Sequence, residues 1–127
     1  SLISVWNGKV YRKNNPKKII LMRKVYYKGL SENEEINKNI VNFFYTRLFY
    51  KSDEEIVRVY NKEYDINCEN EKIQFLLFFM IDRIFRNRFD YSPIIVDSKN
   101  DEIELLGKVK LIKPNKLLLI NDFMKKV

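Results

Sequence analysis

The sequence predicts an α+β fold with strands at both ends of the chain and helices between them. Residues 2–28 are rich in β-branched and aromatic side chains, and residues 102–112 alternate between apolar and polar. The middle of the chain repeats apolar residues at helical spacing and twice places Ser three residues before Glu, a helix-start signal. We expect one compact domain over residues 1–127, with the helices packed on one sheet face. The first residue is Ser, which also fits a domain excised from a larger protein.

The first segment is expected to form a three-stranded antiparallel meander. Residues 2–6 are the first strand, and Asn7-Gly8 supplies the two positions that tolerate positive φ in a type I′ hairpin turn. Residues 9–13 are the return strand. A second turn at 14–17 leads into a long third strand over residues 18–28.

Three helices are predicted next. Gly29 ends the strand, and Ser31 with Glu34 matches a capping box for the first helix, which extends to Leu48. Ser52 with Glu55 opens a second helix that ends near residue 63. The third helix covers about residues 69–87 and is apolar nearly all round, as a central core helix is. The helical phenylalanines are all expected in the core: Phe43, Phe44, Phe49, Phe75, Phe78, Phe79 and Phe85.

The β pattern returns at Pro93 and predicts a C-terminal three-stranded antiparallel meander. Its strands are residues 93–97, 102–112 and 116–120, joined by polar turns. Residues 121–127 are either a short helix or a frayed end. The pattern leaves open whether the two meanders share one sheet.

The composition excludes several kinds of chemistry. The chain has no His, so Ser-His-Asp catalysis, His-ligated zinc and a histidine acid or base are excluded. A single cysteine, Cys68, makes neither an internal disulfide nor a cysteine-rich metal site, and we expect it to be structural. No Gly-rich phosphate loop and no long apolar run is present. We therefore predict an intracellular, cytoplasmic protein without a cofactor or a metal.

The residue usage indicates an AT-rich source. Lys, Asn, Ile, Phe and Tyr make up about half of the chain, and Ala is absent. A virus, a low-GC bacterium or a protozoan parasite fits this usage. For a viral protein the expected location is the host cytoplasm or nucleus.

Positive charge is concentrated at the N-terminus. The formal net charge is +7, yet residues 1–30 carry eight cations and no acid. Codon bias alone would not remove acids from one quarter of a chain, so this segment is a candidate basic patch. The cations predicted to contact phosphate are Arg12, Lys13, Lys17, Lys18, Arg23 and Lys24. The rings predicted to stack on bases are Trp6, Tyr11, Tyr26 and Tyr27.

Both faces of the predicted third strand mix charges with rings, so the sequence does not say which face is outward. The alternative interpretation of the basic segment is a solvated Lys-rich edge that blocks edge-to-edge aggregation. Trp6 has a similar alternative, which is to anchor the core.

An arginine cluster ends the third helix. Arg83, Arg86 and Arg88 suit phosphate or carboxylate, because a guanidinium binds either one in a fork. The alternative is that they complement the negative end of the helix dipole.

A carboxylate group near the C-terminus loosely resembles a metal-dependent nuclease site. It consists of Asp97, Asp101, Glu102 and Glu104, with Lys108 and Lys110 beyond. Such sites need two or three convergent oxygens with a Lys near the scissile phosphate, and the spacing here does not match a sharp motif. We expect no enzyme activity, although the pattern does not exclude a nuclease.

The leading functional hypothesis is a non-enzymatic module that binds RNA or single-stranded nucleic acid through its basic N-terminal strands. A narrower form is a nucleotide or cap-like pocket in a viral polymerase accessory domain. The alternative is a protein–protein interaction domain, or a subunit of a larger viral or bacterial assembly, that docks on an acidic partner.

Overall fold

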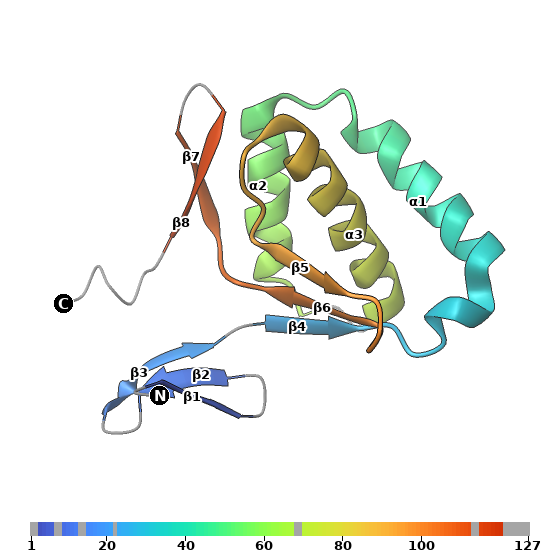
Figure 1. The fold of residues 1–127 in the computed structure, drawn as a ribbon. Helices are drawn as coiled ribbons and strands as arrows, with labels where there is room; N and C mark the ends of the chain where they lie inside the picture. Colours follow the sequence, from blue (N-terminus) through green and yellow to red (C-terminus); the bar gives the residue numbers. More distant parts are fainter. Residues whose placement is uncertain are drawn as a thin grey trace.

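The fold is known from a computed structural model, which describes the backbone of residues 3–6, 9–12, 15–21, 23–67, 70–112 and 115–120 and, within these ranges, the side chains from residue 23 onward. Over these residues it is a mixed α/β structure with three α-helices and small antiparallel sheets (Figure 1). The helices are α1 (Glu34–Leu48), α2 (Asp53–Tyr64) and α3 (Glu71–Arg88), and a short 3-10 helix, η1 (Leu30–Asn33), precedes α1. The strands are β1 (Ile3–Trp6), β2 (Lys9–Arg12), β3 (Asn15–Leu21), β4 (Arg23–Tyr26), β5 (Ile94–Asp97), β6 (Glu102–Leu105), β7 (Val109–Ile112) and β8 (Lys116–Leu119).

The described strands pair in three antiparallel sheets. The order is β1-β2-β3 in the first, β4-β6-β5 in the second and β7-β8 in the third. In the second sheet Val25, Ile103 and Val96 lie opposite one another, so one face of this sheet is apolar. Helix α3 packs on the β4-β6-β5 sheet and also contacts α1 and α2 (Figure 1). The predicted N-terminal three-stranded meander is present as the β1-β2-β3 sheet.

The third N-terminal strand is shorter than predicted. The run predicted over residues 18–28 is divided into β3, which pairs with β2, and β4, which pairs with β6 from the far end of the chain. The division follows from packing, because β4 brings Val25 and the adjoining Tyr27 into the core below α3. Local β propensity was right for both pieces, but it did not indicate that they belong to different sheets.

The predicted C-terminal three-stranded meander is confirmed only in part: β5 pairs with β6 and β7 pairs with β8, both antiparallel, but the two pairs belong to different sheets. The expected long strand is interrupted between β6 and β7, where Gly107 has a φ of 151°, a value that favours glycine. Helix α2 holds this corner: the Tyr60 hydroxyl donates to the Gly107 carbonyl at 2.6 Å, and the Asn61 side chain hydrogen-bonds both the N–H and the C=O of Val109. As a result β6 joins β4 and β5, while β7 pairs with β8.

The core is centred on α3, as the all-round apolar pattern predicted. Phe75, Phe78, Ile81 and Phe85 of α3 are all at most 1 % exposed. They pack with buried side chains of the sheet and of α2: Val25 of β4, Tyr27 just after β4, Ile56 and Tyr60 of α2, Ile94 of β5, and Ile103 and Leu105 of β6. Burial of this apolar surface is the main force that holds the helices on the sheet.

The two predicted capping boxes had different outcomes. The box at Ser52 is confirmed: its Oγ accepts from the Glu55 N–H, and the Glu55 carboxylate accepts from the Ser52 N–H, each at 3.2 Å. These hydrogen bonds hold the pKa of Glu55 below its usual value. The box at Ser31 is wrong, because residues 30–33 form η1 and α1 begins only at Glu34.

The Ser52 cap provides a first test of the fold. We expect Ser52→Ala to lower the free energy of unfolding by about 1 kcal/mol, since it leaves an N–H at the start of α2 without its acceptor. Ser52→Thr keeps the hydroxyl and should recover most of the loss. Urea unfolding followed by circular dichroism measures both. An unchanged midpoint for Ser52→Ala would show that the cap does not stabilise the fold.

Helix α1 is less buried than the sequence predicted. Phe43 is 51 % exposed and Phe49 is 43 % exposed. The prediction that both are core residues is therefore wrong. The reason is that α1 packs against α3 along one side, where Leu48 and Asn37 are buried. The apolar side chains on the two flanks of α1 remain accessible.

Within the described residues, no helix has the length and apolar character that a membrane crossing requires.

Candidate functional site

Several predicted binding residues belong to the first sheet. Trp6 is in β1, Tyr11 and Arg12 are in β2, and Lys17 and Lys18 are in β3. Their side chains, and the whole of Lys13, lie outside the described residues. Cys68 lies outside them as well. The roles assigned to these residues remain predictions.

Tyr27 is not a base-stacking residue. Its side chain is 1 % exposed, and its ring meets Phe75 edge-on at 5.8 Å between centroids. Its hydroxyl hydrogen-bonds the Asn37 side chain, which in turn donates to the Leu30 carbonyl and so holds the turn before α1. The pleat therefore directs Tyr27 into the core and its neighbour Tyr26 outward, which answers the question that the sequence left open.

Arg23 lies on the inner face of β4 and is engaged within the fold. Its guanidinium donates to the backbone carbonyls of Glu63, Tyr64 and Ile66 at the end of α2, and to Gln74 Oε1 at 2.7 Å. The last carbonyls of a helix have no partner in the helix, so this arginine serves as the cap of α2. Its hydrogen bonds are not available for phosphate unless this cap is broken.

Lys24 and Tyr26 lie on the outer face of β4. The Tyr26 ring is 49 % exposed. The Lys24 ammonium is 3.5 Å from the Glu102 carboxylate of β6, and hydrogen bonding with the same carboxylate raises the pKa of Tyr26. Tyr26 is thus the one predicted stacking ring that is accessible among the described residues. Lys24 is partly neutralised by Glu102.

The three arginines of α3 do not form one cluster. The Arg86 Nε donates to both oxygens of Asp82, and its Nη2 donates to the Ile94 carbonyl of β5. Arg88 donates to the Phe49 and Lys51 carbonyls, each at 2.7 Å, beyond the end of α1. Both arginines therefore tie α3 to its neighbours. The dipole interpretation is incomplete, because Arg88 caps a helix other than its own.

Arg83 differs from the other two. Its side chain is exposed, and its guanidinium lies 5.8 Å from the centroid of the Phe79 ring. Within the described part of the chain it has no hydrogen bond or ion pair with another residue. Its charge is therefore available to a ligand.

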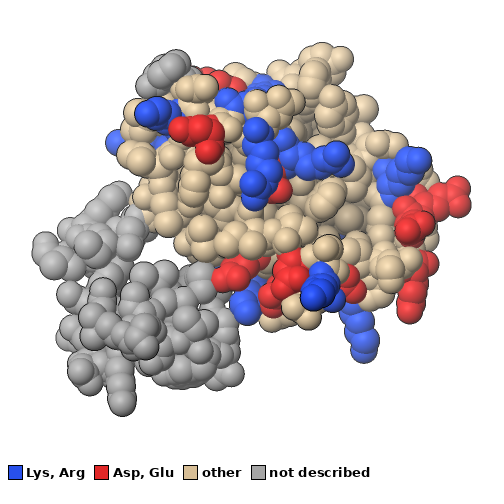
Figure 2. All heavy atoms as spheres, viewed as in Figure 1, with Lys and Arg blue, Asp and Glu red and all other residues tan. Residues whose placement is uncertain are grey.

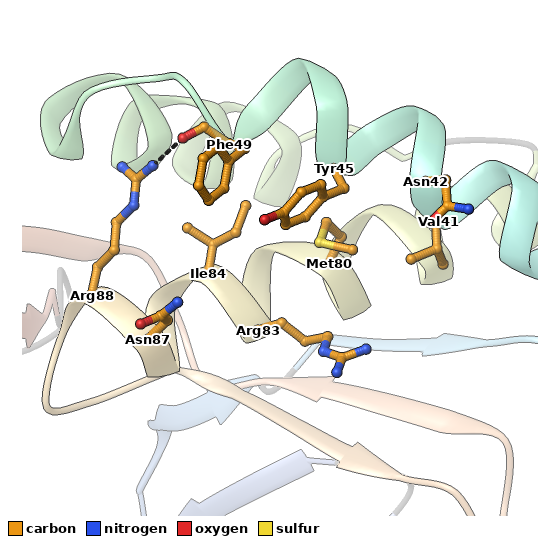
Figure 3. Close-up of a pocket in the computed structure, with 9 residues that line it drawn as sticks. All are labelled: Val41, Asn42, Tyr45, Phe49, Met80, Arg83, Ile84, Asn87 and Arg88. Carbon is orange, nitrogen blue, oxygen red and sulfur yellow. Dashed lines mark hydrogen bonds between the residues drawn. The ribbon is translucent and has the colours of Figure 1, made fainter.

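Arg83 borders a hollow between α1 and α3, with a volume of about 530 Å³ (Figure 3). Figure 3 shows side chains of the two helices facing each other across it, with Tyr45 and Met80 near the middle. The hollow is lined by Val41, Asn42, Tyr45, Phe49, Met80, Arg83, Ile84, Asn87 and Arg88. Two arginines and no carboxylate are among these residues.

The sequence pattern did not indicate the α1 side of this hollow. The apolar residues at helical spacing in this segment are Ile36, Ile40, Phe43, Phe44 and Leu48, and Tyr45 is not among them. The available signal was a pair of aromatic residues four positions apart, Tyr45 and Phe49, which lie on the same side of a helix. In the structure their ring centroids are 4.9 Å apart. A helix with apolar residues on two flanks has more apolar surface than one neighbouring helix covers.

The charge of the chain is unevenly divided between the described regions. Residues 1–22 carry five cations and no acid. By contrast, residues 23–67, 70–112 and 115–120 together carry 16 Lys and Arg against 15 Asp and Glu. Figure 2 shows the two signs interspersed over the visible face of this part. The net positive charge of the chain therefore comes mainly from the segment of β1, β2 and β3.

The fold brings part of the predicted carboxylate group together, since Asp97 of β5 lies opposite Glu102 of β6, but both side chains have other partners. Asp97 accepts hydrogen bonds from the Lys99 and Asn100 backbone and from the Asn100 side chain, and the Asn100 amide is the main reason that the pKa of Asp97 is lowered. Glu102 pairs with Lys24 on the sheet. Among the described residues no group of three or more Asp, Glu or Cys side chains converges as a metal site would require.

Comparison with known proteins adds no functional assignment, since no family model, curated protein or solved structure matches this chain.

Proposed function

We propose that this protein is a non-enzymatic module that binds RNA or single-stranded nucleic acid through the segment of β1, β2 and β3. The observation that carries the proposal is the charge division. Five cations without any acid stand in 22 residues, beside a part of the chain that is close to neutral. Phosphates attract such a segment because bound cations release counterions from the nucleic acid.

The residues proposed to contact phosphate are Arg12, Lys13, Lys17 and Lys18, with Lys24 on the strand that follows. The proposed stacking rings are Trp6, Tyr11 and Tyr26. Aromatic faces accept any base, so this combination favours single strands with little sequence preference. Arg23, Tyr27, Arg86 and Arg88 are no longer included, because their side chains are used inside the fold. Arg83 is exposed but belongs to α3 and not to the basic segment, so it is not included either.

Fluorescence anisotropy with a labelled 20-nucleotide single-stranded RNA tests the proposal. The variant changes Arg12, Lys13, Lys17 and Lys18 to Ala. A matched control changes Lys62, Lys99, Lys110 and Lys116 to Ala, which removes the same charge from exposed positions elsewhere. Affinity is measured at about 50 and 200 mM salt, with single-stranded DNA, duplex RNA and heparin for comparison.

We expect the first variant to reduce the slope of log affinity against log salt by about 3, since each lost phosphate contact on a single strand removes about 0.7. The control variant should change the slope by much less. Equal losses in the two variants would mean that only net charge matters, and the proposal would then fail. Competition by heparin at the same strength as by RNA would also contradict it.

The same samples distinguish binding from cleavage. The labelled RNA should remain intact after incubation with the protein and Mg²⁺ or Mn²⁺, as shown by a denaturing gel. A cut product that disappears with EDTA would replace the binding proposal with a metal-dependent nuclease.

A further inference from the structure

The hollow between α1 and α3 continues into a second one. The second hollow has a volume of about 500 Å³ and shares Val41 and Arg83 with the first. It extends past Leu76 and Phe79 of α3 to Ser98 and Asp101, in the turn between β5 and β6. The two hollows therefore form one groove along α3, here called the α1–α3 groove.

The length of the α1–α3 groove suits a short peptide. Along α3 it is lined from Phe75 to Arg88, a distance of about 20 Å at the helical rise of about 1.5 Å per residue. A bound helix of three to four turns spans this distance. Such a helix presents apolar residues at positions i, i+3, i+4 and i+7 to a groove.

The floor of the groove is apolar. Val41, Met80 and Ile84 line one half, and Leu76 and Phe79 line the other. Tyr45 and Phe49 form a wall, and both rings are 43 % exposed. Asn42 and Asn87 add amide groups to the lining. An apolar floor with a few polar groups is typical of a site that binds apolar side chains and orients them by hydrogen bonds.

The charge in the groove favours an acidic occupant. Arg83 lies where the two hollows meet and, within the described chain, is not paired with any carboxylate. The half that ends at Arg88 has no carboxylate in its lining, but Arg88 itself pairs with Asp53. The other half carries Glu34 and Asp101 together with Lys38, so the preference for a carboxylate in the occupant rests on Arg83. A nucleic acid strand fits less well, since its phosphates need several available cations rather than an aliphatic floor.

We propose that the α1–α3 groove binds an acidic amphipathic helix of a protein partner, with its apolar side on Val41, Tyr45 and Phe49 and a carboxylate on Arg83. This proposal is independent of nucleic-acid binding, because it uses a different part of the chain. Arg83 supplies the orientation, and the accessible wall of Tyr45 and Phe49 supplies most of the affinity.

The test uses two synthetic 14-residue peptides and the full chain. Both peptides carry Leu at i, i+3, i+4 and i+7; one has Glu beside this stripe and the other has Lys at the same positions. Binding is followed by anisotropy and by the ¹³C methyl signals of methionine, of which the chain has three. Met80 lines the groove and reports on its occupation directly.

We expect the Glu peptide to bind, to shift the Met80 signal, and to bind more tightly than the Lys peptide. Arg83→Glu should weaken the Glu peptide by about tenfold, because a repulsion replaces an attraction at a half-exposed site. The same variant should strengthen binding of the Lys peptide. Arg58→Glu, an exposed position on α2, is the matched charge control and should change neither affinity beyond about twofold.

The wall is tested separately. Tyr45→Ser should weaken binding of the Glu peptide at least fivefold, while Phe43→Ser, on the other flank of α1, should leave binding unchanged.

An unmoved Met80 signal at millimolar peptide overturns the proposal, and so does equal binding of the two peptides. A Met80 shift caused by single-stranded RNA, or by raising the protein concentration alone, would assign the groove to nucleic acid or to a second copy of the chain. Arg83→Glu should leave RNA binding intact, so the two proposals fail independently.

Discussion

Arg23→Ala is expected to lower the free energy of unfolding by about 3 kcal/mol. One guanidinium supplies four hydrogen bonds that join β4 to the end of α2 and to Gln74 of α3. A hydrogen bond to a charged group contributes roughly 1.5–3 kcal/mol in proteins, and the four are not additive because they share one side chain. Loss of the guanidinium leaves the Glu63, Tyr64 and Ile66 carbonyls without this donor.

Two matched variants separate this role from charge. Arg23→Lys keeps the positive charge but replaces the planar fork with one ammonium, so it should recover less than half of the loss. Lys24→Ala, on the opposite face of the strand, should cost no more than about 0.5 kcal/mol, because its ion pair with Glu102 is partly exposed. Urea unfolding measures all three proteins. A midpoint for Arg23→Ala equal to that of the unchanged protein would show that the cap has no energetic value.

Tyr60→Ala is expected to lower the free energy of unfolding by about 4 kcal/mol, the largest single effect among these predictions. Its side chain is 0 % exposed and contacts the rings of Tyr64, Phe78 and Phe85. Truncation of a buried aromatic residue to Ala costs about 3–5 kcal/mol, partly through the cavity that it leaves. Tyr60→Phe should cost about 1–2 kcal/mol, since only the hydrogen bond to the Gly107 carbonyl is lost.

The ionisation of Tyr60 adds a pH dependence. Burial raises the pKa of Tyr60 far above 10.0, and burial also raises the pKa of Tyr64 and Tyr91. Because these pKa values are raised in the folded state, the contribution of the three tyrosines to the free energy of unfolding is fully present below about pH 10. It falls as the pH rises above this value, because the tyrosines ionise more readily in the unfolded chain than in the folded protein. The protein should therefore unfold in alkali.

Tyr60→Phe should reduce this alkaline sensitivity. Urea midpoints between pH 8 and 11 should fall steeply for the unchanged protein and less steeply for Tyr60→Phe. Tyr50→Phe is the control, because Tyr50 is 86 % exposed, and its profile should match that of the unchanged protein. Parallel profiles for all three would mean that Tyr60 ionises as easily when folded as when unfolded.

The local signals in the sequence predicted local structure well. The Ser52 box marks the start of α2, and the all-round apolar run identified α3 as the central helix. Both features depend on residues within one or two helical turns. The Ser31 box failed because the Tyr27, Asn37 and Leu30 contacts hold the preceding turn in another shape.

The assignment of single side chains to the site was less successful, and the reasons are physical. Tyr26 and Tyr27 are neighbours with similar sequence surroundings, yet the pleat directs them to opposite faces, and only the position of α3 decides which face is buried. Arg83, Arg86 and Arg88 look equivalent in sequence. Their roles differ because Arg86 hydrogen-bonds Asp82 and Ile94 and Arg88 hydrogen-bonds the end of α1, whereas the Arg83 side chain bonds none of these groups.

The sequence by itself excluded histidine-based catalysis and an internal disulfide. It also predicted the three helices, most of the strand segments and the basic character of residues 1–22. These follow from composition, charge and short-range periodicity. Only the tertiary structure decided which strands share a sheet, which of two neighbouring tyrosines is accessible, and that α1 and α3 enclose a groove beside Arg83, which pairs with no carboxylate of the described residues. These features depend on contacts between residues far apart in the chain, such as Tyr60 with Gly107, and no short-range pattern encodes them.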